Sequence, residues 1–385
     1  MPEHSPPPLP LAGVRVADFS RVLAGPLATM LLGDLGADVI KVERPGTGDD
    51  TRGWGPPFVG GDAAYFLALN RNKRSVVLDL STDDGRSAAR ALALSSDVVV
   101  ENFRPGLMAR FGLDHGSLAH EQPGIVYCSL TAFGDEGEAA TKPGYDIIMQ
   151  ALSGIMSVTG QPGGEPTKVG VALLDVICGL YAANAVQAAL LGRAATGVGG
   201  HVSVSLFDAS VAALVNQAAN FLLGGVVPRP MGSAHPNIVP YQLFETADRP
   251  FILAAGNDRL FARACEVIGL PQLAQEDRFA TNEARVRNRE QLIPLMQEVL
   301  SRRSSADWIA SLEAASVPCA PVRGVDEVFG SPEGAAMVQE VEDPLHGLLR
   351  LVAGPIRLGG SLAEIRLPPP ALGEHTAVVL RELDA

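Results

Sequence analysis

Basic residues and aromatic residues are both scarce in this chain of 385 residues. Lys and Arg together number 30 against 43 Asp and Glu, which gives a formal net charge of −13. A general nucleic-acid-binding protein presents a basic face, so this charge balance argues against that class of partner. It does not exclude an anionic small ligand, because a few local arginines dominate the field at short range. Aromatic residues make up 5% of the chain, so Ala, Val, Leu and Ile must build the core.

Cysteine is rare, and membrane or export signals are missing. The cysteines lie far apart and have no metal-type pair spacing, which indicates reduced structural thiols in a cytoplasmic protein: Cys128, Cys178, Cys265 and Cys319. The N-terminal stretch MPEHSPPPLPLAG lacks the basic and apolar regions of a signal peptide and is expected to be an extended arm. The most apolar stretch, residues 171–191, contains Asp175, Asn184 and Gln187, which favours a buried helix over a membrane span.

The motifs of several enzyme classes are also absent. The first loop reads DFSRVLAGP and has no G-x-G-x-x-G, so no nicotinamide dinucleotide site is expected, although Glu43 lies 25 residues after Asp18. The chain has neither the G-x-S-x-G string of many hydrolases nor a P-loop. The seven histidines include no pair at metal-ligand spacing, so no metal site is expected. His235 lies in a turn-like segment and is expected to support a loop.

Short apolar strands alternate with helices in the first half of the chain. We predict strands at residues 14–19, 38–43, 74–80, 97–102 and 124–131, with helices at 26–36 and 82–95. This alternation predicts an α/β fold with a parallel sheet and right-handed crossovers. Ligands bind beyond the carboxyl ends of such strands. Polar residues gather at those ends: Asp18, Arg21, Glu43, Arg44, Asp79, Glu101, Asn102 and Ser129.

A Gly- and Pro-rich stretch at residues 224–240 predicts a domain boundary. We expect a large Rossmann-like domain at residues 1–223, a smaller α/β domain with linkers at 224–330, and a C-terminal segment at 331–385 that returns to the large domain. Before the boundary, residues 201–208 alternate like a half-buried strand. After it we predict a strand at 251–256, an amphipathic helix at 281–303 and a last helix at 375–383.

Asp175 is the most informative single residue. It lies between four apolar residues and Val-Ile-Cys, where burying a carboxylate is costly unless the group has a partner or a task. The pattern favours a helix N-cap, because Asp is preferred there and the predicted helix begins at this point. A nucleophilic role is compatible with that position, since a helix N-terminus keeps a carboxylate ionised and the ionised form attacks.

Arginines follow several of the predicted strand ends. Arg21, Arg44, Arg104 and Arg110 would converge on one edge of a parallel sheet, and guanidinium groups bind phosphate in a bidentate way. The alternative is that each one is a solvated surface charge. For the run RNKR at residues 71–74 that alternative is the better interpretation, because short charge runs are usually exposed.

Taken together, the strings resemble those of the class III CoA-transferases, the CaiB/BaiF family. The resemblance runs from about Leu11 to the C-terminus, and the joint order and spacing of the strings carries it: DFSRVLAGP (18–26), GADVIKVERPGTGDDTRGWGPP (36–57), NRNKRSVVLDL (70–80), VENFRPG (100–106), PGYDIIMQALSG (143–154), ALLDVICGLYA (172–182) and LGEHT (372–376). GDDTRGWGPPFVG and AHPNIVPYQLF look most similar to the succinyl-CoA:glutarate type of the family.

The resemblance implies an acyl-CoA:carboxylate CoA-transferase. It assigns the catalytic aspartate to Asp175, with transfer through an aspartyl-CoA thioester. Acyl-CoA and small carboxylic acids are the implied substrates, with no permanently bound cofactor and no metal. An interlocked, ring-like homodimer is also implied. With Arg104 added from its place beside a strand end, the expected CoA-binding residues are Arg21, Val22, Ala24, Arg44, Leu78, Asn102, Phe103, Arg104, Arg110, Lys142, Tyr145 and Asp146.

Two departures narrow the implied activity. Leu23 stands where formyl-CoA-type members have glutamine, and the small domain lacks their glycine-rich loop, which argues against oxalate or formate as a substrate. The alternative is a 2-methylacyl-CoA racemase of the same fold, which pairs a histidine with the aspartate. Tyr145 takes that position here, and a tyrosine with an ordinary pKa of about 10 is a poor base at neutral pH, which favours transfer.

Overall fold

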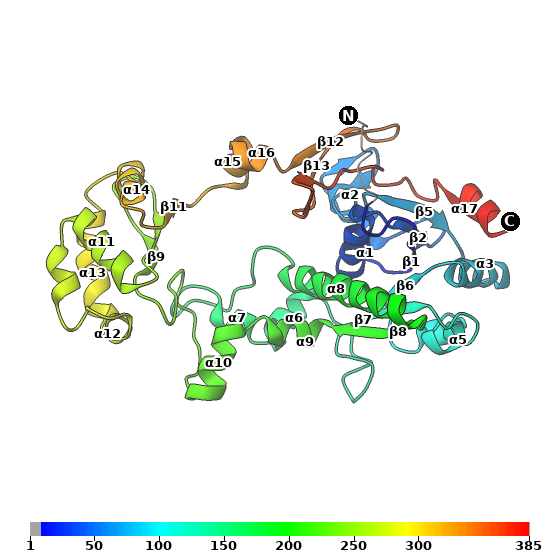
Figure 1. The fold of residues 1–385 in the computed structure, drawn as a ribbon, viewed down its shortest axis with the longest axis horizontal. Helices are drawn as coiled ribbons and strands as arrows, with labels where there is room; N and C mark the ends of the chain where they lie inside the picture. Colours follow the sequence, from blue (N-terminus) through cyan, green and yellow to red (C-terminus); the bar gives the residue numbers. More distant parts are fainter. Residues whose placement is uncertain (1–8, 385) are drawn as a thin grey trace. The chain divides into compact units, whose positions relative to one another are not determined.

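The computed structural model describes residues 9–384, so most of the predicted N-terminal arm lies outside the described residues. The chain forms two compact units (Figure 1). The first contains the chain up to residue 155, residues 169–224 and the chain from residue 333, and the second contains residues 156–168 and 225–332. These limits lie next to the boundaries predicted after residues 223 and 330, but residues 156–168 cluster with the second unit. The predicted division into domains stays a prediction.

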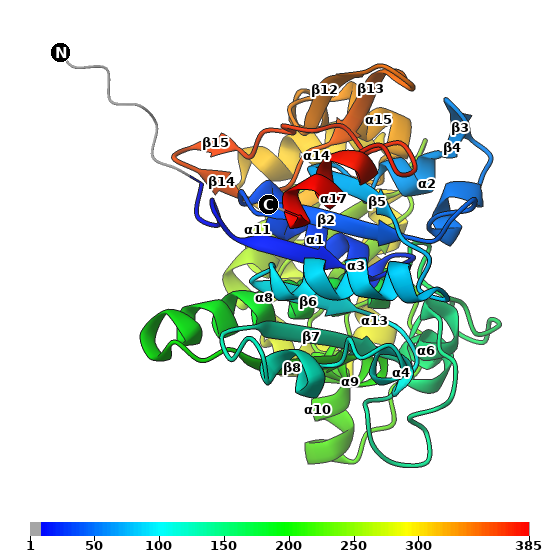
Figure 2. The same cartoon turned by 90° about the vertical axis from the view of Figure 1, so that its right-hand side faces the viewer.

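A six-stranded parallel sheet forms the centre of the first unit, with the strand order β5-β2-β1-β6-β7-β8 (Figure 2). Counted along the chain, this is the order 3-2-1-4-5-6 of a Rossmann fold, which confirms the predicted α/β class. Its central strands are continuous apolar runs because both faces are covered. The strands are β1 (Arg15–Asp18), β2 (Asp38–Glu43), β5 (Lys73–Val77), β6 (Val98–Glu101), β7 (Val126–Thr131) and β8 (Gly200–Ser205).

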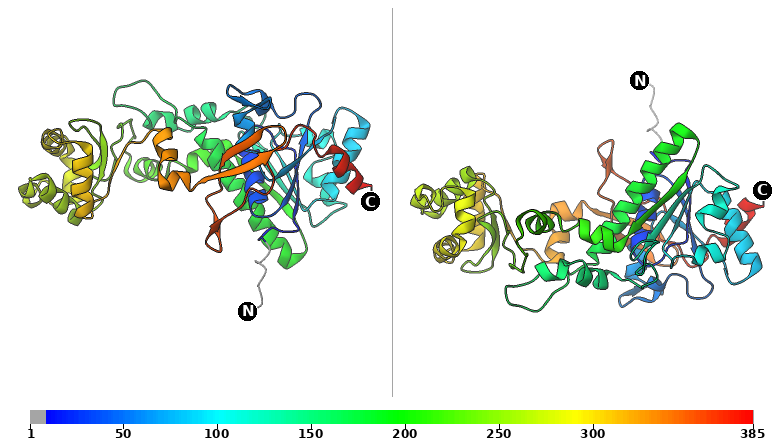
Figure 3. Two further views of the ribbon diagram at one scale, coloured as in Figure 1. Left: turned by 90° about the horizontal axis from the view of Figure 1, so that it is seen from above. Right: turned by 90° about the horizontal axis from the view of Figure 1, so that it is seen from below.

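Helices cover both faces of this sheet (Figure 3). On one face α1 (Ala24–Asp34), α8 (Leu173–Thr196) and α9 (Leu206–Ala212) share a core with β1, β6 and β7. On the other face α3 (Asp83–Leu94), α4 (Leu107–Arg110), α5 (His115–Ala119) and α17 (Thr376–Leu383) share a second core. Among the described residues, α8 meets the length and hydropathy criteria for a membrane span, as does the bent pair of α9 and α10 (Val215–Gly224) if counted together. In the structure α8 packs against α1, β7 and β8.

The C-terminal segment returns to the sheet and covers its edge strand β5. The Val77 N–H donates to Thr376 Oγ1 at 3.0 Å, and the Gly373 N–H donates to Ser75 Oγ at 2.9 Å. The LGEHT string therefore satisfies the backbone of a strand edge that would otherwise be open for pairing with another chain. Small elements complete this unit: β3 (Phe58–Val59), β4 (Asp62–Ala63), α2 (Ala64–Leu67), α6 (Asp146–Leu152), α16 (Pro332–Ala335), the hairpin β12 (Val338–Asp343) and β13 (Gly347–Val352), β14 (Arg357–Leu358) and β15 (Ser361–Leu362).

The run RNKR is buried, so the prediction of an exposed charge run is wrong. Arg71 pairs with Asp34 at 2.6 Å, and the fully buried Lys73 lies 3.1 Å from Asp18. Arg74, which is partly exposed, pairs with Asp38 at 2.6 Å. The carboxylates that neutralise these cations come from α1, β1 and β2, which are distant in sequence.

The second unit has an antiparallel sheet with the order β11-β10-β9 and its own apolar core. The single helix predicted at residues 281–303 is two helices, because Asn288 adopts non-helical angles between them. The buried Arg285 donates to the carbonyls of Val239 and Phe279, which fixes α12 to the preceding loops. The elements are β9 (Tyr241–Phe244), β10 (Phe251–Ala254), α11 (Asp258–Ile268), α12 (Asn282–Arg287), α13 (Arg289–Leu300), α14 (Ser305–Ala314), β11 (Cys319–Pro321) and α15 (Val325–Gly330); α7 (Ile155–Val158) joins the two units.

Candidate active site

The loops that leave β1 and β6 meet at the carboxyl edge of the sheet. These two strands are neighbours, and the chain leaves them toward opposite sides of the sheet, which is where Rossmann folds bind ligands. The side chain of Asn102 joins the two loops, because its Oδ1 accepts from the Arg21 N–H at 2.8 Å and its Nδ2 donates to the Arg21 carbonyl at 2.7 Å. At the sheet edge where a ligand was predicted to bind, the two loops are therefore held together by hydrogen bonds.

The backbone of the first loop is held in an unusual conformation. Val22 has a φ of 71°, a left-handed geometry that is unfavourable for a β-branched residue. Its N–H points between both carboxylate oxygens of Asp49, at 3.3 Å each. The fully buried Lys41 ammonium lies 2.8 Å from Asp49 Oδ2 and donates to the Ser20 carbonyl at 2.9 Å. Burial alone would raise the pKa of Asp49, but the Lys41 charge and several hydrogen bonds lower it to about 2.

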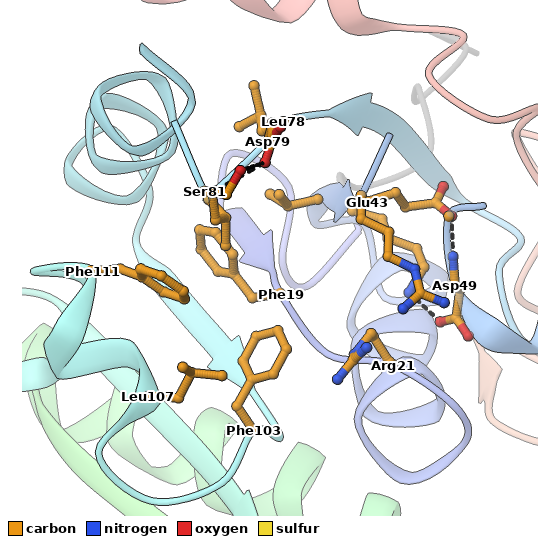
Figure 4. A pocket seen from close by; sticks show the side chains of 15 residues that line it. Phe19, Arg21, Glu43, Asp49, Leu78, Asp79, Ser81, Phe103, Leu107 and Phe111 are labelled. Atoms are coloured by element: carbon orange, nitrogen blue, oxygen red, sulfur yellow. Dashed lines mark hydrogen bonds and ion pairs between the residues drawn. The ribbon is translucent and has the colours of Figure 1, made fainter. Parts of the chain in front are cut away.

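A first cavity of about 310 Å³ opens beside this loop. Phe103, Leu107 and Phe111 form an apolar side, and Arg21 lies across from them with Asp49 (Figure 4). The Arg21 guanidinium carbon is 4.9 Å from the centroid of the Phe103 ring, within the range of a cation–π contact. An apolar wall beside two arginines suits a ligand with a flat ring and phosphates. The predicted binding residues that line this cavity are Arg21, Arg44, Leu78 and Phe103.

A second cavity of about 300 Å³ adjoins the first, because Arg21 and Phe103 line both. It reaches Asp175 at the start of α8 and Tyr145 before α6. Leu23, the residue that departs from the formyl-CoA pattern, also lines it. The predicted site residues brought together here are Arg21, Val22, Ala24, Asn102, Phe103, Arg104, Lys142, Tyr145 and Asp175.

Asp175 is in the first turn of α8, but the predicted N-cap role is wrong. The helix begins at Leu173, its N-cap is Ala172, and no side chain of the cap residue accepts a hydrogen bond. Asp146 supplies the acceptor instead, because its Oδ1 accepts from the Leu174 N–H at 2.9 Å. The other oxygen of Asp146 accepts from Gln150 Nε2 at 2.6 Å. Both oxygens of this buried carboxylate are thus occupied next to Asp175.

The surroundings of Asp175 disfavour its charge. Burial is the main cause and the neighbouring charge of Asp146 is the second, and together they raise the pKa of Asp175 to about 7. The helix N-terminus acts in the opposite direction, but no cation offsets the burial as Lys41 does for Asp49. A carboxylate with this pKa exchanges its proton near neutrality, and weakly solvated carboxylates are the more reactive nucleophiles.

Two predicted binding residues do not line either cavity. Arg110 is exposed at the end of α4, and Asp146 is buried with its oxygens accepting from Leu174 and Gln150. Other residues at the site were not predicted. Lys41 and Asp49 line the first cavity and Asp50 the second. The only signal for the two aspartates was the GDD string at residues 48–50.

An aromatic pair near Asp175 was also missed. Tyr65 packs edge-to-face against Trp54 with ring centroids 5.6 Å apart. The pKa of Tyr65 is raised by burial and then by the charge of Asp175, so the phenol lies within electrostatic reach of that carboxylate.

His235, in the second unit, accepts from the Asn237 N–H at 3.0 Å, which fits the predicted loop role. Among residues 9–384 no cluster of three or more His, Cys, Asp or Glu could hold a metal ion.

Several known proteins are similar to this chain over nearly its whole length. A succinate–glutarate CoA-transferase from Agrobacterium fabrum is 43% identical over all of this chain and 97% of its own length. The human succinyl-CoA:glutarate CoA-transferase is 41% identical over 97% of this chain and 86% of its own length. The crystal structure of a CaiB/BaiF family protein from Brucella suis is 44% identical, covers 98% of this chain and 100% of its own, and superposes with a TM-score of 0.85.

Residues 11–376 match CoA-transferase family III, which is nearly the whole of the described chain. The full-length relatives and the shared architecture agree with that match, and the predicted resemblance is confirmed. This protein belongs to CoA-transferase family III.

Proposed function

We propose that this CoA-transferase moves CoA from an acyl-CoA donor such as succinyl-CoA to a dicarboxylic acid such as glutarate, through a covalent intermediate on Asp175. One observation carries the proposal: the half-buried Asp175 carboxylate, with its pKa raised to about 7, lines a cavity that adjoins a second, arginine-lined and partly apolar cavity. Two relatives that match nearly all of this chain are named as succinate–glutarate and succinyl-CoA:glutarate CoA-transferases, which supports this donor and acceptor.

The two cavities fit the two ends of CoA. The adenine would lie against Phe103, Leu107 and Phe111, and the phosphates would meet Arg21 and Arg44. The pantetheine arm would then pass Arg21 and Phe103 into the second cavity and carry the thioester toward Asp175. The remaining proposed CoA contacts are Val22, Ala24, Leu78, Asn102, Arg104, Lys142 and Tyr145. A contact with Arg110 stays a prediction, and we assign Asp146 to the support of Asp175.

The first half of the proposed cycle loads CoA onto the enzyme. The Asp175 carboxylate attacks the donor thioester carbonyl, the C–S bond breaks, and CoA leaves as the thiolate. The product is a mixed anhydride of the donor acid and Asp175. The thiolate then attacks the aspartyl carbonyl of this anhydride, which releases the donor carboxylate and leaves an aspartyl-CoA thioester.

The second half runs the same steps with the acceptor. The acceptor carboxylate attacks the aspartyl thioester and displaces the thiolate, which then attacks the acceptor's acyl carbonyl. The new acyl-CoA leaves and the Asp175 carboxylate is regenerated. One thioester is exchanged for another, so the cycle balances without a net proton transfer, ATP or a metal ion. Asp175 starts and ends the cycle as a carboxylate, and only this ionised form attacks the thioester.

The racemase alternative has less support. A racemase needs a second base opposite Asp175, and the family position for it holds Tyr145, whose side chain is exposed at the second cavity. The two reactions also differ at the α-carbon of the acyl group, because a racemase exchanges the α-proton and a CoA-transferase retains it. Incubation of a 2-methylacyl-CoA in D₂O would incorporate α-deuterium with a racemase, and we expect none.

We also propose a homodimer, with the interlocked ring-like arrangement implied by the family, in the cytoplasm. Large apolar side chains are exposed along several helices of the first unit, and α10 has no buried residue. Exposed large apolar side chains in such number support an interface, because monomeric proteins seldom leave large apolar patches in water. The residues are Ile147, Ile148 and Leu152 on α6, Leu180, Tyr181 and Leu191 on α8, and Val215, Phe221, Leu222 and Leu223 on α10. Light scattering of the purified protein would measure the mass, and a monomer would contradict the proposal.

Intact-mass analysis tests the covalent mechanism. After incubation with succinyl-CoA, we expect an adduct of the mass of CoA that hydroxylamine removes. Asp175→Ala should give no adduct and lose at least about 1,000-fold in kcat, because a covalent nucleophile has no substitute. A panel of dicarboxylates as acceptors would then rank the substrates. An Asp175→Ala protein that exchanges thioesters at the wild-type rate would remove the basis of the proposal.

A further inference from the structure

Arg21 and Arg44, the two arginines of the first cavity, share one acidic partner. Arg44 forms an ion pair with Asp50 Oδ1 and donates from Nε to Thr47 Oγ1 at 2.6 Å. On the other side, Arg21 Nη1 lies 3.6 Å from Asp50 Oδ2. The Asp50 carboxylate therefore lies between the two guanidinium groups that face the proposed phosphate position.

This aspartate differs from its neighbour Asp49, which holds the loop together. Asp49 is buried, accepts from the Thr51 N–H as the cap of the short helix η1 (Asp50–Gly53), and pairs with Lys41. Asp50 lines the second cavity with 36% of its side chain exposed. Its carboxylate pairs with the two arginines, and the backbone N–H groups of Val22 and Thr51 donate to Asp49. The conformation of the loop thus depends on Asp49, whereas Asp50 contributes a negative charge beside the two arginines of the site.

The pairs that Asp50 makes are of the kind that a ligand displaces. The side chains of Arg21 and Arg44 are 36% and 48% exposed, and ion pairs at such exposure contribute little to stability. A phosphate group offers more negative charge and a bidentate geometry to the same guanidinium groups. A carboxylate that remains beside bound phosphates also repels them.

We propose that Asp50 takes the place of a CoA phosphate on Arg21 and Arg44 in the free protein and yields both arginines when CoA binds. This inference rests on the proposed function. Asp50 keeps the two like-charged guanidinium groups close together before the substrate arrives. It also lowers the affinity for every CoA species, which favours release of the product acyl-CoA in a cycle that binds and releases a CoA thioester at each turnover. Asp50 is accordingly a positioning residue that sets substrate affinity.

Calorimetric titration with CoA tests the proposal on the full-length protein. We expect Asp50→Asn to bind CoA about three- to tenfold more tightly than the wild type, because it removes one competing charge near the phosphates. Asp50→Ser, a smaller neutral variant, should also bind more tightly. Asp50→Glu, which keeps the charge, should stay within about twofold of the wild type. The matched control is Asp83→Asn in the first turn of α3, which removes the same charge from an exposed side chain outside both cavities.

The kinetics give a second measurement that a structural role would not reproduce. For Asp50→Asn the KM for succinyl-CoA should fall with no rise in kcat, since tighter binding of substrate and product does not speed the chemical steps. Dephospho-CoA identifies the phosphate concerned. Retention of the gain with this ligand supports the pyrophosphate as the partner, and loss of the gain supports the 3′-phosphate.

The outcomes separate this inference from the proposed function. Equal or weaker binding of CoA by both neutral variants, with melting temperatures near that of the wild type, overturns the role of Asp50. Should one neutral variant fail to fold, the other decides the question by the same criterion. A wild-type protein that binds no CoA at all would instead contradict the proposed function.

Discussion

Asp49 and Asp175 are carboxylates of the same unit, the first buried and the second half-buried at the candidate site, yet their environments shift their pKa values in opposite directions. The pKa of Asp49 is lowered to about 2, because the Lys41 ammonium at 2.8 Å outweighs the effect of burial. The pKa of Asp175 is raised to about 7, because burial and the Asp146 carboxylate both disfavour its charge. Burial is thus common to both residues, and the sign of the nearest charge makes the difference.

This difference separates the part of the site that holds its shape from the part that reacts. The Lys41–Asp49 pair fixes the left-handed backbone at Val22, and an ion that is fully paired has little tendency to react. Among residues 9–384 no ion pair is formed by Asp175, which is unfavourable for folding but useful for nucleophilic attack. The left-handed backbone at Val22 and the Asp175 carboxylate at the start of α8 both cost free energy, which favourable contacts elsewhere in the unit must offset.

The largest effect that tests this comparison is on stability at the loop. Lys41→Met leaves the Asp49 carboxylate buried without its paired cation, so we expect a loss of about 3–5 kcal/mol in the free energy of unfolding. Chemical denaturation followed by circular dichroism measures it. The double variant Lys41→Met with Asp49→Asn should recover part of the loss, because no unpaired charge remains.

An exposed ion pair provides the control for that measurement. Arg350 and Glu340 lie on the β12–β13 hairpin at 3.6 Å, with side chains 67% and 59% exposed. Arg350→Met should therefore cost less than about 1 kcal/mol. A Lys41→Met loss as small as this would mean that water reaches Asp49 and that the two carboxylates do not differ as described.

At Asp175 the comparison predicts a gain in stability. Asp175→Asn removes a carboxylate whose ionised form is disfavoured in the folded state, so the variant should be more stable than the wild type at pH 8 by up to about 4 kcal/mol. A pKa raised from 3.8 to about 7 sets the pH window. Below about pH 4 the wild-type group is protonated and has no penalty, and the penalty grows as pH rises to 7.

Denaturation at pH 4.5 and at pH 8 checks the sign of this effect. The gain of Asp175→Asn should be small at the lower pH and full at the higher one. A gain of the same size at both would indicate better packing by the amide rather than relief of a buried charge. A loss at pH 8 would mean that the carboxylate has a cationic partner, in contradiction to the assigned pKa.

The sequence predicted the parts of this site that depend on local pattern. Strand periodicity gave the sheet to within a few residues, and the rule that ligands bind at the carboxyl ends of parallel strands led to Arg21, Arg44 and Asn102. The resemblance added Val22, Leu78 and Tyr145, which line the cavities, while their contacts with CoA stay predictions.

The pairing of buried charges could not be predicted in this way. RNKR reads as an exposed run because the partners of Arg71 and Lys73, Asp34 and Asp18, lie far away in the sequence. Lys41 was not singled out, because nothing in the string DVIKVE shows that its side chain turns inward to meet Asp49. At α8 the Asp preference for N-caps misled the assignment, because Asp146, 28 residues before Leu174, supplies the acceptor. Long-range ion pairs and caps depend on tertiary contacts, which a single sequence does not display.

The smallest of these effects is on the ionisation of Asp175. Asp146→Asn removes the one neighbouring charge that raises the pKa of Asp175, so that pKa should fall by up to about one pH unit. Because only the ionised carboxylate attacks, kcat/KM of the wild type should rise with pH and level off above about 7. In the variant the midpoint should lie lower, so the activity at pH 6 becomes a larger fraction of the plateau. The pH dependence of kcat/KM with succinyl-CoA and glutarate, measured from pH 5 to 9, gives both midpoints.

The height and the midpoint of that profile report different things. The Asn side chain can still accept from the Leu174 N–H but loses the hydrogen bond from Gln150, so the plateau should fall as the start of α8 loosens. The shift in midpoint reports the charge that Asp146 loses, and Asp83→Asn, on the opposite face of the sheet, should leave the midpoint unchanged. If Asp146→Asn lowers the plateau but leaves the midpoint in place, the charge of Asp146 does not reach Asp175, and the lack of a cation such as Lys41 makes this carboxylate differ from Asp49.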